Sequence, residues 1–227
     1  MFGTSKQSAI TGVAALAEPV RRRLYEAVAT APGSLGREAA AEVAGVPVHT
    51  AKFHLDKLVD AGLLEVEFRR LTGRTGPGSG RPAKLYRRAE REIHVELPAR
   101  QYDLLSRILA RAVARSDAGE ERVAEVAGRV AREEGVAMGE SRASSGAELK
   151  QLCQVLTDVG YEPQLDEDQT VRLLNCPFHH AAREQTDLVC GLNLEYVSGV
   201  RDGMGCTGVA TALDPGPCRC CVSLRQT

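Results

Sequence analysis

The sequence predicts an α+β protein in three parts: an N-terminal helical domain that ends in a β-hairpin, a helical linker, and a small cysteine-rich α+β domain. Three observations support this prediction. Short apolar-periodic segments between residues 18 and 62 lead into two strand-like segments. Longer amphipathic stretches follow Pro98. All seven cysteines lie beyond residue 152. The expected boundaries are therefore residues 1–95, 96–145 and 146–227.

The two halves of the chain differ in charge. At 227 residues the chain is longer than a typical single domain, which favours two modest domains. Up to Val95 it contains 15 Lys and Arg against 10 Asp and Glu, whereas the remainder contains 14 against 20. Only the first half is therefore suited to bind a polyanion.

The sequence gives no sign of export or of membrane insertion. No run of about 18 apolar residues occurs. The N-terminus has Lys6 as its only early base, and no apolar stretch with a cleavage site follows. We therefore expect a cytoplasmic protein without a membrane segment. In a reducing cytosol, clustered cysteines more often bind metal or act as redox-active thiols than form structural disulfides.

Three short helices are expected in the first domain. The first opens at Pro19, because proline is tolerated at a first helical position, where its missing N–H costs nothing. The second covers residues 37–44, with Ser34 as its cap. A tight turn at residues 45–47 then leads into a third helix from Val48 to about Ala61.

A basic hairpin follows the third helix. Leu64 to Arg70 is expected as its first strand and Ala83 to Arg88 as its second. The segment from Thr72 to Pro82 holds four glycines and two prolines, which indicates the tip. Helix, tight turn, helix and hairpin together are the layout of a winged helix-turn-helix. A basic wing can lie along a phosphate backbone or enter a minor groove.

The segments LAEPVRRRLYEAV, AAEVAGVPVHTAKFHLDKLVDAGLLEVE and GRPAKLYR resemble the winged-helix domain of ArsR-like bacterial regulators, over residues 16–88. The resemblance implies binding to a double-stranded DNA operator, with the third helix in the major groove. The resemblance also implies that the residues exposed on that helix and facing the major groove are Val48, His49, Thr50, Lys52, Phe53 and His54. The alternative is a winged helix that docks a protein. The expected DNA-binding residues are His49, whose role is open, Thr50, Lys52, His54, Arg69, Arg70, Arg74, Arg81 and Lys84.

Two amphipathic helices are expected between the domains, from Ala99 to about Ser116 and from Glu120 to Gly139. Their apolar faces could pack onto the second domain or onto a second subunit. Regulators with one helix-turn-helix usually dimerise, because two half-sites match a two-fold protein. We therefore expect a homodimer, with this region as a helical dimerisation linker.

The last part is expected to combine a small sheet with helices. Ala147 to Asp158 is predicted as an amphipathic helix, and residues 177–200 as a loop with two short helices. The expected strands are GYEPQL, TVRLLN, CTGVATAL and PCRCCVSL.

The cysteine spacing predicts a binding site assembled by the fold. The pattern Cys176-x13-Cys190-x15-Cys206-x14-Cys221 differs from paired zinc knuckles and from the tight ferredoxin run. Ligands would therefore arrive from separate elements. Cys190 is expected near the start of a helix, where the N-terminus lowers the pKa of a thiol and favours thiolate.

The winged helix together with NCPFH, LVCGLNLEYVSGV and a terminal CCV resembles the SufR-type iron–sulfur regulators and their actinobacterial relatives. The resemblance implies an iron–sulfur cluster, [4Fe-4S] or [2Fe-2S], whose state controls DNA binding. It implies as ligands Cys176, Cys190 and the pair Cys220 and Cys221, with Cys220 preferred within the pair. Departures from the family pattern leave the fourth ligand open among Cys206, Cys218, Cys221, His179 or none.

The sequence thus predicts a transcriptional regulator whose cluster senses redox or cluster status. The alternative is a regulator that senses zinc or thiol–disulfide chemistry. An enzyme is not expected, because the chain contains no glycine-rich nucleotide loop followed by a helix and no nucleophile–base motif.

Overall fold

The computed structural model describes residues 6–70, 82–117, 119, 121–143 and 149–227. The chain forms two compact units, Met1–Val95 and Glu96–Thr227. The helical region expected as a linker lies within the second unit.

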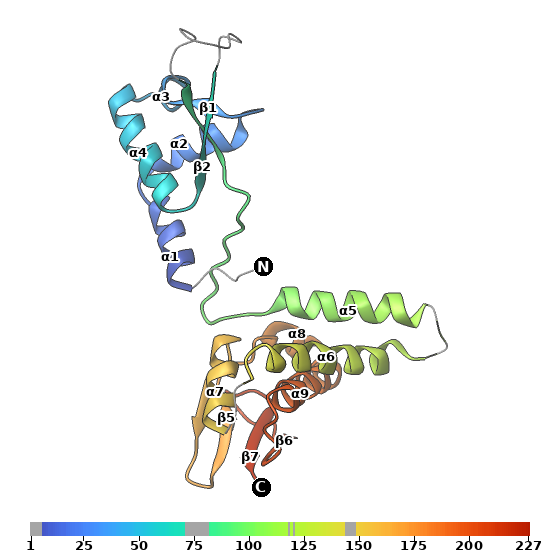
Figure 1. Ribbon diagram of the computed structural model, residues 1–227. Helices are drawn as coiled ribbons and strands as arrows, with labels where there is room; N and C mark the ends of the chain where they lie inside the picture. Colours follow the sequence, from blue (N-terminus) through green and yellow to red (C-terminus); the bar gives the residue numbers. More distant parts are fainter. Residues whose placement is uncertain (1–5, 71–81, 118, 120, 144–148) are drawn as a thin grey trace. The chain divides into compact units, whose positions relative to one another are not determined.

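The first unit packs helices against a small antiparallel sheet of order β1-β3-β2 (Figure 1). Leu24, Leu55 and Leu58 of two helices meet Leu64 and Tyr86 of the sheet in its core. The elements are α1 (Lys6–Ala15), α2 (Pro19–Thr30), β1 (Leu35–Gly36), α3 (Arg37–Ala44), α4 (Val48–Asp60), β2 (Leu64–Arg69) and β3 (Ala83–Arg88).

Local sequence signals explain how these helices begin and end. The Glu18 carboxylate caps α2 by accepting hydrogen bonds from the backbone N–H groups of Val20 and Arg21. These bonds hold the pKa of Glu18 below its usual range. Gly45 ends α3 in the left-handed conformation, with φ of 64°, which glycine adopts without steric cost. The expected turn between α3 and α4 is therefore present.

Two details of this unit differ from the sequence prediction. Ser34 does not cap α3; Gly36 occupies the N-cap position and makes no side-chain cap bond. The reason is that Leu35 and Gly36 form the short strand β1, which pairs with β3 and displaces Ser34 from the helix end. The helix α1 was not predicted.

The second unit places helices against an antiparallel sheet of order β4-β5-β7-β6. Figure 1 shows α5 and α6 lying side by side, with α9 beyond α6. One of the two helices expected in residues 177–200 is long: α9 has 18 residues. The elements are α5 (Tyr102–Ser116), α6 (Val123–Glu140), α7 (Leu149–Asp158), β4 (Pro163–Leu165), β5 (Thr170–Leu173), α8 (His179–Glu184), α9 (Thr186–Gly203), β6 (Val209–Leu213) and β7 (Val222–Gln226).

The apolar faces of α5 and α6 contribute to the core of this unit. Leu105 and Ile108 of α5 and Val130 of α6 are buried with Tyr161 and Tyr196 in one cluster. The sequence left open whether these apolar faces pack onto the second domain or onto a second subunit. In this chain they pack onto the second domain.

Helices α6 and α9 meet through their backbones. A Cβ atom added at Gly135 or Gly139 of α6 would overlap backbone atoms of α9, and one added at Gly199 or Gly203 of α9 would overlap those of α6. Each helix thus presents two glycines four residues apart, which allows a closer approach than side chains permit. Ion pairs from Arg132 to Glu195 and Asp202 flank this contact.

We expect Gly199→Ala to destabilise the second unit by about 1–3 kcal/mol, because the overlapping atoms are backbone and cannot rotate away. Urea unfolding of the full chain, followed by circular dichroism, measures the change. The matched control is Gly128→Ala in α6, where an added Cβ would lie 3.8 Å from the nearest atom. That variant should be neutral or more stable by up to about 1 kcal/mol. Equal effects at the two positions would contradict the close backbone contact.

Candidate functional site

The helix α4 presents a mixed polar and apolar surface. Ala51, Leu55 and Leu58 face the core, whereas the side chains of His49, Lys52 and Phe53 are exposed and Thr50 is half-buried. Val48 is also exposed at the first turn. This surface has the composition of a DNA-reading helix, in which polar groups bind base edges or phosphates and apolar groups contact thymine methyls.

His54 lies away from this surface, and the prediction that it is exposed is wrong. Its side chain is 16 % exposed, and its Nδ1 atom lies 3.5 Å from the Oε2 atom of Glu18. The same carboxylate caps α2, so His54 of α4 lies beside the start of α2. The ring of Phe53 contacts the ring of His54 edge-on, with centroids 5.1 Å apart.

The strands of the expected wing are present, and their basic residues fall into two groups. Arg69 and Arg70 are exposed at the end of β2. Lys84 on β3 instead donates a hydrogen bond of 2.6 Å to Asp56 of α4. Burial opposes ionisation of Asp56, but the Lys84 ammonium holds the pKa of that carboxyl below its usual range. The expected wing tip, with Arg74 and Arg81, lies outside the described residues.

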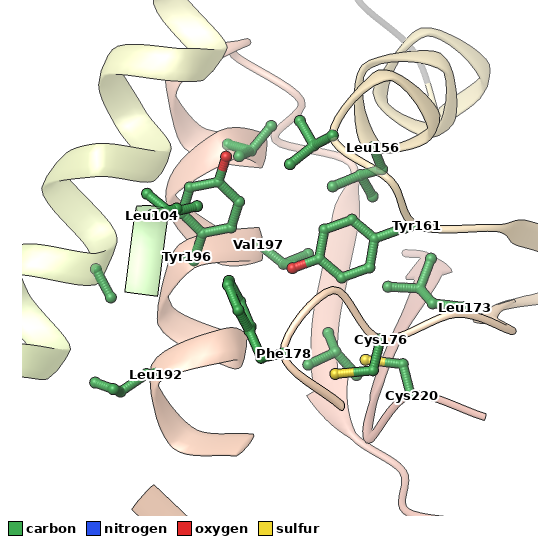
Figure 2. Packing of buried hydrophobic residues seen from close by; sticks show 14 of the residues in the cluster. Leu104, Leu156, Tyr161, Leu173, Cys176, Phe178, Leu192, Tyr196, Val197 and Cys220 are labelled. Carbon is green, nitrogen blue, oxygen red and sulfur yellow. The ribbon is translucent and has the colours of Figure 1, made fainter. Parts of the chain in front are cut away.

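In the second unit, four of the seven cysteines meet in one pocket of about 380 Å³. Cys176 follows β5, Cys190 lies in α9, and Cys220 and Cys221 precede β7. Figure 2 shows the sulfur atoms of Cys176 and Cys220 side by side at the edge of the core. The pocket is also lined by His179, Ala182, Arg183, Thr186, Pro215, Gly216 and Arg219.

Cys220 and Cys221 both reach this pocket because they are not part of a strand, contrary to the sequence prediction. The strand β7 begins only at Val222. The two cysteines lie in a bend whose ends are fixed by backbone bonds of 2.7 Å, from Cys220 N to Leu173 O and from Asp214 N to Cys221 O. In a strand, adjacent side chains would point to opposite faces. In the bend, the side chains of Cys220 and Cys221 can both reach the same pocket.

Three cysteines lie elsewhere. Cys206 is buried in the core, 3 % exposed, and does not line the pocket. Cys218 is exposed and has a φ of 55°, and it also does not line the pocket. Cys153 on α7 is half-buried beside the core. Burial raises the pKa of the Cys206 and Cys153 thiols, so both remain protonated.

The four thiols of the pocket influence one another. The interaction with Cys220 lowers the pKa of Cys176, and the interaction with Cys176 raises that of Cys220. Interactions with Cys220 and Cys190 lower the pKa of Cys221 to about 6.

The prediction of a low pKa for Cys190 is wrong. Burial, followed by its bond to Cys221, raises the pKa of Cys190 to about 12. Cys190 is the fifth residue of α9, beyond the first turn where the helix N-terminus acts on charge.

Asn193 is a buried polar residue behind the pocket, in contact with Cys220, that the sequence analysis missed. Its side chain is fully buried, and its Nδ2 atom donates to the sulfur of Cys220 at 3.0 Å. The hydroxyl of Tyr161 donates to the Oδ1 atom of the same amide. An asparagine three residues after Cys190, within an apolar helix, is the sequence signal that could have identified it.

Four cysteine side chains at one pocket are the type of donor set that binds iron–sulfur clusters or zinc. Soft thiolates select iron–sulfur clusters, zinc or copper(I), and a set of four cysteine thiolates is the usual ligation of both cluster types. Asn193 supplies the N–H···S bond that often surrounds such ligands. Among the described residues, no three Cys, His, Asp or Glu side chains already surround a single-ion position.

Comparison with known protein families gives a match within the first unit. Residues 16–67 match the family of helix-turn-helix domains. The match supports a DNA-binding transcriptional regulator. It extends from the residues before α2 into β2. No curated protein and no solved structure matches the chain. In the described part of the chain, no helix is both long and apolar enough to cross a membrane.

We expect Lys52→Ala to weaken binding to duplex DNA, because Lys52 is exposed on α4, the helix expected to enter the major groove. Loss of one phosphate contact lowers the slope of log K against log salt by about 1. Fluorescence anisotropy of a labelled duplex over a salt series measures the slope. Lys150→Ala, which removes the same charge from the second unit, is the control. An unchanged slope in Lys52→Ala would show that this side chain does not contact phosphate.

Proposed function

We propose that the protein is a homodimeric transcriptional regulator that reads a double-stranded operator through α4 and the wing, and that senses redox or cluster status through an iron–sulfur cluster in the cysteine pocket. The observation that carries this proposal is the meeting of Cys176, Cys190, Cys220 and Cys221 in one pocket. These residues are up to 45 positions apart in the sequence. A regulator with one helix-turn-helix needs a second copy to read a two-fold operator.

The same four cysteines are the proposed ligands. A cluster held by four thiolates supplies reversible one-electron chemistry and sensitivity to oxidants. Cys176 and Cys220 bind at the inner end of the pocket, where both are buried, and Cys190 and Cys221 at its more exposed end. His179 is exposed at the pocket and stays open as a substitute ligand. Cys206 and Cys218 do not line the pocket, which argues against them as the fourth ligand.

Ligation by these cysteines would restrain three segments at once. The loop after β5, the first half of α9 and the bend before β7 each contribute at least one thiolate. The bend is also held by its backbone bonds and by the 3.0 Å bond from Arg219 to Asp214. A coupling free energy of about 1–3 kcal/mol between pocket and operator gives a 5- to 150-fold change in DNA affinity.

A serine scan under anaerobic conditions tests the ligand set. We expect wild-type protein to be brown, with matching iron and acid-labile sulfide. Cys176→Ser, Cys190→Ser, Cys220→Ser and Cys221→Ser should each lose most of the iron. Cys153→Ser, Cys206→Ser and Cys218→Ser, which remove thiols outside the pocket, are the matched controls and should retain it. Wild-type protein without iron and sulfide would refute the cluster.

DNA binding by the same samples tests the regulation. Wild-type protein with and without its cluster should differ at least 5-fold in affinity for an operator selected from random duplexes. Pocket variants should behave as the cluster-free protein in both preparations. Equal DNA affinities in all samples would show that the cysteine pocket does not regulate DNA binding.

One observation favours a second function, a zinc or thiol–disulfide sensor. Cys220 contacts Cys176, and Cys221 contacts Cys190, so each sulfur already has a neighbour with which it could pair. A colourless protein that contains zinc, or that loses two hydrogens per disulfide on mild oxidation, would favour this alternative.

A further inference from the structure

A buried amide lies beside the innermost sulfur of the pocket. Asn193 is on α9, one turn after Cys190, and its side chain has no exposed surface. Its Nδ2 atom lies 3.0 Å from the Cys220 sulfur and 4.0 Å from the Cys221 sulfur. A single NH2 group thus faces both members of the cysteine pair.

The direction of this amide is fixed from its other end. The Tyr161 hydroxyl donates to Asn193 Oδ1, and Tyr161 is 1 % exposed between α7 and β4. If the amide turned over, its oxygen would face the Cys220 sulfur, and a metal-bound thiolate has no proton to donate to that oxygen. The Tyr161 hydroxyl would then have to accept from the NH2 group instead of donating to the oxygen. The observed orientation satisfies both partners, with the NH2 group directed at Cys220 and the oxygen at Tyr161.

We infer that Asn193 is a positioning residue for metal at this pocket, which holds the Cys220 sulfur in place and stabilises its negative charge, and that Tyr161 sets the orientation of Asn193. This inference rests on the proposed function. It applies to a thiolate bound to a cluster or to zinc, because the N–H···S bond acts on the ligand sulfur in both cases. Such outer groups orient ligands and tune metal affinity and reduction potential.

The opposing interpretation is that Asn193 only satisfies a polar position in the core. Another residue of the same helix provides the matched comparison. Ser198 is also buried, and its hydroxyl makes a 2.7 Å hydrogen bond to Thr211. Ser198→Ala removes a buried hydrogen bond from α9 at a position that does not line the cysteine pocket.

Cobalt(II) binding to the reduced, metal-free full-length protein is the test, because thiolate–cobalt charge-transfer bands report directly on the ligand sulfur. We expect Asn193→Leu to bind cobalt about 10- to 100-fold more weakly and to shift these bands. Tyr161→Phe should change the cobalt affinity and the band positions in the same direction by a smaller amount. Ser198→Ala should have the same cobalt affinity and band positions as wild type. Circular dichroism of each variant confirms the fold, and Tyr161→Phe remains the decisive variant if Asn193→Leu does not fold.

The reduction potential of the anaerobically reconstituted cluster is the second measurement. We expect it to fall in Asn193→Leu and in Tyr161→Phe, because an N–H···S bond stabilises the more negative, reduced form. Unchanged bands, affinity and potential in both variants would overturn the role of Asn193 while leaving the cysteine site intact. Wild-type protein that takes up neither cobalt nor cluster would overturn the metal site and this inference together.

Discussion

The second unit depends on the backbone contact between α6 and α9. Gly135 and Gly139 on one helix and Gly199 and Gly203 on the other leave no space for a Cβ atom. This contact fixes the position of α9 relative to the rest of the core. The same helix supplies Cys190 to the pocket and Asn193 to the sulfur of Cys220, so the placement of both residues depends on four glycines outside the pocket.

The pocket itself is completed by irregular backbone. Cys176 follows a strand, and the bend that holds Cys220 and Cys221 is anchored at Leu173 and Asp214. Antiparallel pairing of β5 with β7 brings the two segments together. The buried end is therefore part of the hydrophobic core, whereas the end near Cys190 and Cys221 is more open to solvent.

The sequence was most informative where a local signal determines the structure. Pro19 and the turn at Gly45 mark helix boundaries through their backbone preferences, and the helices α2, α3 and α4 follow as predicted. The spacing of the cysteines indicated a site assembled from separate elements, and the structure brings Cys176, Cys190, Cys220 and Cys221 into one pocket. Whether they bind a cluster stays a prediction.

Features that depend on long-range contacts could not be predicted from local sequence signals. His54 has the helical position of a surface residue, and only the approach of Glu18 at the start of α2 covers it. Lys84 is basic like its wing neighbours, but Asp56 lies within 2.6 Å of it across the domain. Asn193 acquires its partners from the segment before β4 and from the bend before β7, neither of which a helical pattern reveals.

The glycine contact also restricts which sequence changes the second unit can accept. Any substitution at Gly135, Gly139, Gly199 or Gly203 adds a Cβ atom that would overlap the backbone of the facing helix. Because backbone atoms cannot rotate away as a side chain can, such a change would have to move a whole helix. A single mutation far from the cysteines could therefore displace Cys190 together with the helix that carries it.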